Sequence, residues 1–130
     1  MGKYVISYAG CAAVMVALDV LWLGYIAPDF YKRTIGHLLA PKPDLVVAAL
    51  FYVLYVAGVV FFAVAPALTA GGWPRAALLG AFAYMTYDLT NLATLRDFPV
   101  IVAAADIAWG AFITACAATG GYFAVQAAGR

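Results

Sequence analysis

Three aspartates, Asp19, Asp88 and Asp106, lie in stretches of the sequence that are otherwise mostly apolar. A carboxylate at the centre of a helix in lipid costs roughly 2.5–3.5 kcal/mol on insertion scales, so such side chains are expected to face a bundle interior or a wet cavity. Three carboxyls close together at low dielectric cannot all ionise, and at least one should remain protonated near pH 7. The chemistry that they predict is the binding or relay of a proton, a cation or a polar ligand.

Two of these acids occur in the same short pattern. Asp19 precedes Trp22 by three positions, and Asp106 precedes Trp109 with the same spacing. Residues i and i+3 share one face of a helix, and a buried indole N–H needs an acceptor, which a carboxyl on that face or on a facing helix can supply. We therefore assign both tryptophans to the candidate site. A weaker hypothesis is that a planar ligand lies between the two indoles.

The segment around Asp88 is the most polar of the apolar stretches. Tyr84, Asp88 and Asn91 are spaced i, i+4 and i+7, which places them in one stripe along a helix. Because a polar helix in lipid should be surrounded by others, we expect this one at the centre of a bundle. The hydroxyls of Tyr52 and Tyr55 can add to the same interior. The candidate ligand or proton site therefore comprises Asp19, Asp88, Asp106, Asn91, Tyr84, Trp22 and Trp109.

The sequence predicts neither a catalytic residue nor a metal or cofactor site. It contains one histidine, His37, and no HExxH, P-loop, GxSxG or CxxC motif. Oxygen ligands would suit a hard cation at the aspartates, but nothing fixes a coordination geometry. No nucleophile with an adjacent base is visible, so an enzyme is not the favoured interpretation. Hydrogen bonding between helices, without further function, is the alternative interpretation of the acids.

The composition indicates the class of protein to which these side chains belong. Of the 130 residues, 68% are hydrophobic and 10% are charged, against roughly 25% charged in soluble domains. This balance excludes a disordered chain and leaves too few polar residues to cover a soluble monomer. The net charge of +1 offers no basic patch for nucleic acid. We expect a polytopic membrane protein in contact with the lipid bilayer.

Four long apolar stretches cover most of the chain, at about residues 4–27, 45–68, 76–95 and 100–125. Each is close to the ~20 residues that a helix needs to cross ~30 Å of hydrocarbon. We therefore predict an all-α fold in which residues 1–130 form a single polytopic membrane four-helix bundle. Lysine and arginine do not orient this bundle, because three of them fall on one predicted side and four on the other.

The connections between the stretches predict further features. Residues 28–44 form the longest one, in which Phe30, Thr34 and Leu38 are spaced i, i+4 and i+8, and this predicts a short interfacial helix between spans one and two. The connection of residues 96–99 is tight, so the helices that it joins must be antiparallel neighbours. Four aromatic residues near the predicted helix ends are expected in the interfacial belt: Tyr4, Tyr31, Trp73 and Phe98.

Five segments resemble, in the same order, a family of small bacterial integral membrane proteins that is described as a predicted membrane protein family of unknown function. They are residues 19–24, 36–41, 49–55, 87–94 and 106–110. The resemblance extends over nearly the whole chain. It implies a four-span, multi-pass protein of the bacterial inner membrane, and it implies no activity. Relative to this pattern, residues 80–87 look about one helical turn short, which would make the third span short or tilted.

Two functional hypotheses remain open. In the first, the polar cluster binds or relays a proton, a cation or a polar ligand, and a carrier of this size would act as a homo-oligomer. In the second, the chain is a non-catalytic accessory subunit that packs against a larger membrane protein complex. Its aromatic side chains would then meet the partner, and the acids would hold the bundle together. The aromatic side chains in question are Phe51, Phe61, Phe62 and Phe82.

Overall fold

The computed structural model describes residues 2–39, 41–42, 44–70 and 73–129. Over these residues the chain is helical and forms no strand, which confirms the predicted all-α fold. Helix α1 (Gly2–Leu21) continues into the π-helical segment η1 (Trp22–Ile26). A second helical run consists of α3 (Leu45–Val59), η3 (Val60–Val64) and α4 (Ala65–Ala70). The long helices α5 (Trp73–Thr94) and α6 (Val100–Ala128) follow.

Three segments in the described part of the chain are long and apolar enough to cross a membrane: Gly2–Ile26, Leu45–Val64 and Val100–Ala128. They correspond to the first, second and fourth predicted spans, and they give the protein a multi-pass membrane location. Helix α5 has the length of a span, since its 22 residues rise about 33 Å, and it is not short by a turn. Its mean hydropathy is lower because it contains residues such as Asp88 and Asn91. The count of four spans therefore stays a prediction.

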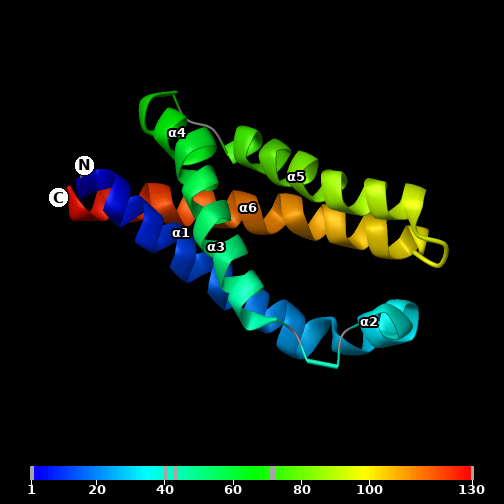
Figure 1. The fold of residues 1–130 in the computed structure, drawn as a ribbon. Coiled ribbons are helices and arrows are strands. Elements are labelled where there is room, and N and C mark those ends of the chain that lie inside the picture. Colours follow the sequence, from blue (N-terminus) through cyan, green and yellow to red (C-terminus); the bar gives the residue numbers. More distant parts are fainter. Residues whose placement is uncertain (1, 40, 43, 71–72, 130) are drawn as a thin grey trace.

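Helix α6 occupies the centre of the molecule. It packs along both α1 and α5, which run antiparallel to it, and α3 crosses the α1–α6 pair steeply (Figure 1). The tight connection thus joins antiparallel neighbours as predicted, but the central place that we expected for residues 76–95 is taken by α6. Helix α5 tolerates an outer position because its threonine hydroxyls donate to carbonyls of their own helix. Examples are Thr86 to Phe82, at 2.9 Å, and Thr94 to Thr90, at 2.7 Å.

Glycines allow the close contacts of α6 with its neighbours. A Cβ atom at Gly80 would lie 2.2 Å from the Gly110 carbonyl oxygen, so α5 and α6 approach backbone to backbone. A Cβ atom at Gly10 would lie 2.8 Å from the Gly120 carbonyl oxygen, which gives α1 and α6 the same kind of contact. The main buried core lies where these helices meet α3 and η3, and it includes Cys11, Met15, Val56, Val59, Val64 and Ile113.

The predicted short helix is present as α2 (Pro28–Ile35) and is followed by the 3-10 turn η2 (Gly36–Leu38). A proline at the first helical position and Asp29 in the first turn favour its start. Helix α2 packs against the turn between α5 and α6 through a small core of Ile35, Phe98, Val102 and Ala103. Phe98 is therefore buried in protein, and its assignment to the interfacial belt is wrong. The side chain of Trp73, from the same expected belt, lies outside the described part of the structure.

Candidate functional site

The three candidate aspartates lie toward the α2 end of the bundle, because α1 leads through η1 into α2 and the turn between α5 and α6 packs against α2. Each is six or seven positions from the nearer end of its helical run, or roughly 9–11 Å along the helix. Asp19 and Asp88 are buried, at 8% and 0% exposure, and Asp106 is partly buried. The acids therefore turn toward protein, which is the direction that the cost of a carboxylate in lipid favours.

Asp19 joins three helices through hydrogen bonds. Its carboxyl on α1 accepts from the Tyr52 hydroxyl on α3 and, at 3.1 Å, from the Trp109 indole Nε1 on α6. Both carboxyl oxygens are thus engaged by buried or partly buried donors. An acid held in this way satisfies the two donors and fixes the relative positions of the three helices.

Asp106 is linked to α2 through Tyr31. The Tyr31 hydroxyl donates to Asp106 Oδ1 at 3.2 Å, and the Trp22 indole Nε1 donates to the same hydroxyl oxygen at 3.2 Å. Tyr31 therefore connects η1, α2 and α6. Because Asp106 is partly exposed, whereas Asp19 and Asp88 are buried, it is the outer member of the polar cluster.

The two tryptophans stack on each other. The rings of Trp22 and Trp109 lie 4.5 Å apart between centroids and 11° from parallel. Each indole N–H is directed to a group on another helix, since Trp109 donates to Asp19 and Trp22 donates to Tyr31. The stack leaves no room for a planar ligand between the indoles, so that hypothesis is wrong. The stacked indoles join the hydrogen bonds around Asp19 to those around Asp106.

Asp88 differs from the other two acids. It is fully buried, and neither carboxyl oxygen has a hydrogen-bond partner among the described residues. Its carboxyl faces that of Asp106, with which it interacts electrostatically. A buried charge without donors is strongly disfavoured in a medium of low dielectric. The pair is therefore the part of the cluster at which a proton would matter most.

The remaining predicted residues, Tyr84 and Asn91, lie beside the cluster. The Tyr84 ring fills the space over Gly110, where a Cβ atom would lie 2.1 Å from it, and it meets the Tyr55 ring edge-on at 6.3 Å between centroids. Tyr84 thus serves the contact between α5 and α6. Asn91 interacts with Tyr87, four positions earlier on the same helix.

Tyr31 is the site residue that the sequence pattern did not identify. We expected it in the interfacial belt, whereas it lies between Trp22 and Asp106. Burial, supported by the nearby carboxylates and opposed by the bond from Trp22, raises the pKa of Tyr31 above its ordinary value, so its hydroxyl stays a neutral donor. Its spacing from Ile35 places both residues on one face of α2, but only the fold shows that this face is buried.

The described residues do not bring together three or more His, Cys, Asp or Glu side chains that could hold a metal ion. The arrangement consists instead of four neutral donors, two indoles and two phenols, around Asp19 and Asp106, with Asp88 next to Asp106. Such a set can hold a proton, orient it and pass it between neighbouring oxygens.

The chain belongs to the family described as "Predicted membrane protein (DUF2177)", whose model matches residues 4–123. This match confirms the family resemblance that the five segments indicated. No curated protein and no solved structure matches the chain.

Proposed function

We propose that this member of the predicted membrane protein family carries an exchangeable proton inside the bilayer, on the carboxyl pair of Asp88 and Asp106. The protein would then be a proton relay or a proton-coupled carrier of the bacterial inner membrane. The observation that carries the proposal is the Asp88 carboxyl, which is fully buried and has no hydrogen-bond partner among the described residues.

A purely structural role is the competing explanation for Asp88. An acid that holds helices together is expected to resemble Asp19, whose two oxygens accept from Tyr52 and Trp109. Leaving a buried polar group without a donor costs about 1–3 kcal/mol, so an Asp88 that never takes up a proton would weaken helix association. A carboxyl that gains and loses a proton accounts for an acid at this place. Two facing carboxyls titrate as a coupled pair, and at low dielectric they share one proton.

The proton would reach the pair from the α2 side. Asp106 is partly exposed, and the Tyr31 hydroxyl that donates to it is carried by α2 itself. Since Tyr31 remains a neutral donor, it holds the Asp106 carboxyl in place without competing for its proton. Asp88 then lies one step deeper, out of contact with solvent.

The substitution Asp88→Asn tests this proposal in protein reconstituted into vesicles that contain a pH-sensitive dye. It keeps the side-chain shape and removes the titrating group, so we expect a normal yield of folded protein and loss of proton flux under an imposed pH gradient. Asp29→Asn replaces an exposed acid on α2 and is the matched control. It should keep both the yield of folded protein and the proton flux.

Two results would overturn the proposal. The first is wild-type proton flux in Asp88→Asn. The second is a loss of folded protein in Asp88→Asn as large as that in Asp19→Asn, which would assign Asp88 to the structural contacts.

The second candidate function is that of an accessory subunit in a larger membrane complex. It is favoured by Phe61, Phe62 and Phe82, which are 71%, 58% and 64% exposed and would face either lipid or a partner. Purification from native membranes in a mild detergent distinguishes a surface that faces lipid from one that faces a partner protein. A stable partner protein would support this function, and migration as single chains or homo-oligomers would contradict it.

A further inference from the structure

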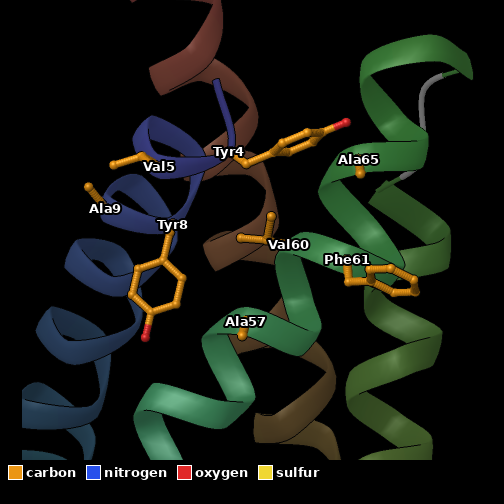
Figure 2. A pocket seen from close by; sticks show the side chains of 8 residues that line it. All are labelled: Tyr4, Val5, Tyr8, Ala9, Ala57, Val60, Phe61 and Ala65. Atoms are coloured by element: carbon orange, nitrogen blue, oxygen red, sulfur yellow. The ribbon is translucent and has the colours of Figure 1, made fainter. Parts of the chain in front are cut away.

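An apolar groove lies between the first turns of α1 and the run formed by α3, η3 and α4, away from the acids (Figure 2). Its volume is about 760 Å³. Side chains from both helical runs line it, including Tyr4, Val5, Ala9, Ala57, Val60 and Phe61. In a bilayer this groove opens toward the hydrocarbon, because both of its walls belong to apolar segments long enough to cross it.

Almost the whole lining of the groove is apolar. Two of its lining residues, Tyr4 and Tyr8, carry hydroxyls, and the Tyr8 hydroxyl donates to the Val53 carbonyl at 2.9 Å and is thereby engaged. Ala9 on α1 and Ala57 on α3 contribute small side chains to the lining, which helps to keep the groove hollow. An extended hydrocarbon chain fits such a lining, and a polar solute does not.

One end of the groove carries a positive charge. The Lys3 Nζ atom lies over the Tyr4 ring, 5.2 Å from its centroid, and the Tyr4 ring reaches from α1 toward Ala65 across the groove (Figure 2). Lys3 is the one charged residue in the segments 2–18 and 45–70 that form the two walls. The two walls therefore present a cation, and no acidic side chain, to a headgroup next to this end.

We propose that this groove binds one molecule of an anionic phospholipid, with an acyl chain in the groove and the phosphate beside Lys3. The apolar lining supplies the affinity for the chain, and the lysine supplies the preference for a negative headgroup. A basic residue at a membrane surface contributes enough to favour an anionic lipid roughly fivefold. This site is independent of the proton pair, because Lys3 and Tyr4 lie at the start of α1, whereas the pair lies on α5 and α6 near Tyr31 of α2, which follows the other end of α1.

Native mass spectrometry of the detergent-solubilised protein tests the proposal, with phosphatidylglycerol and phosphatidylcholine of identical chains in equal amounts. We expect one phosphatidylglycerol to be retained in preference, by roughly fivefold. Lys3→Gln should remove the preference and leave binding of either lipid. Ala57→Phe should fill the groove and remove retention of both.

Two control variants separate the site from general effects. Lys42→Gln removes an exposed lysine elsewhere, and Ala17→Phe adds a ring to an exposed position of α1 outside the groove, so both should behave as the wild type. If Ala57→Phe fails to fold, Ala9→Leu fills the groove from the other wall. Equal retention of the two lipids by the wild type would overturn the proposal. So would unchanged retention after the groove is filled, or an equal effect of Lys3→Gln and Lys42→Gln.

Discussion

Asp19 and Asp88 are both buried in the same bundle, yet their surroundings differ. The carboxyl of Asp19 accepts from a phenol and an indole, whereas that of Asp88 faces another acid and has no donor among the described residues. The first arrangement is that of an acceptor which fixes helices. The surroundings of Asp88 disfavour a charged carboxylate, and they suit a carboxyl that carries a proton.

Tyr31 should make the stability of the fold depend on pH in the alkaline range. Its pKa is raised above the ordinary value of about 10, chiefly by burial, so its neutral form stabilises the fold fully below about pH 10. This contribution is lost as the pH rises through the pKa in the folded state. Tyr31→Phe cannot ionise, so its melting temperature should fall less than that of the wild type between about pH 7 and about pH 11.

Thermal unfolding in detergent at the two pH values measures this difference. Tyr25→Phe is the matched control, because Tyr25 is 80% exposed, and it should follow the wild type. Equal pH dependence in Tyr31→Phe and the wild type would show that burial does not hold Tyr31 in its neutral form.

At the level of residues, the sequence predicted which acids turn inward but not which groups they meet. The burial of Asp19 and Asp88 follows from the cost of a carboxylate in lipid, and this cost belongs to the residue type. The bond from Trp109 to Asp19 depends on how α6 is rotated against α1. Tyr31 enters only because α2 folds back onto the bundle, which spacing within one helix does not reveal.

Helix α2 carries the tyrosine that contacts Asp106, and apolar packing holds the helix in place. Ile35 is 7% exposed in a core with Phe98, Val102 and Ala103. The contact between His37 and Asp97, at 3.6 Å, is an ion pair when the histidine is protonated, and it joins two exposed side chains. Burial of an isoleucine contributes more than an exposed ion pair, whose contribution is about 0–1 kcal/mol.

Ile35→Ala should therefore destabilise the docking of α2 by about 2–5 kcal/mol, while Asp97→Asn should change it by less than about 1 kcal/mol. Hydrogen exchange of the backbone amides of residues 28–35 measures the docking directly. A larger effect of Asp97→Asn than of Ile35→Ala would assign the attachment of α2 to the ion pair instead.

The elements themselves were the most predictable part of the fold. Continuous apolar runs fixed the approximate bounds of the long helices, and the spacing within residues 28–44 identified α2. The order of packing was less predictable. We placed the polar third helix centrally, but its threonines bond their own carbonyls, and the glycines at positions 80 and 110 bring it against only one side of α6.

The path of the chain through the whole molecule favours a fourth membrane crossing, by α5. The segment Leu45–Val64 carries the chain away from the side of α2, and α6 begins beside α2, where Phe98 packs on Ile35. Helix α5 connects these two places. If the three apolar segments cross the bilayer, α5 must also cross it to return the chain to the α2 side.

Cysteine labelling in intact membrane vesicles tests this topology, after replacement of the two native cysteines. Lys42→Cys and Asp97→Cys should react with a membrane-impermeant reagent from the same side, and Gly129→Cys should react from the opposite side. Labelling of positions 42 and 97 from opposite sides would mean that α5 does not cross the membrane.

The central claim is that Asp88 and Asp106 hold a proton between them, and infrared difference spectroscopy of carboxyl groups tests it most directly. Near pH 7, the wild type should show the carbonyl band of a protonated carboxylic acid, as expected for facing acids at low dielectric. The band should disappear in Asp88→Asn and persist in Asp29→Asn. Absence of the band from the wild type, or an unchanged band in Asp88→Asn, would contradict the account.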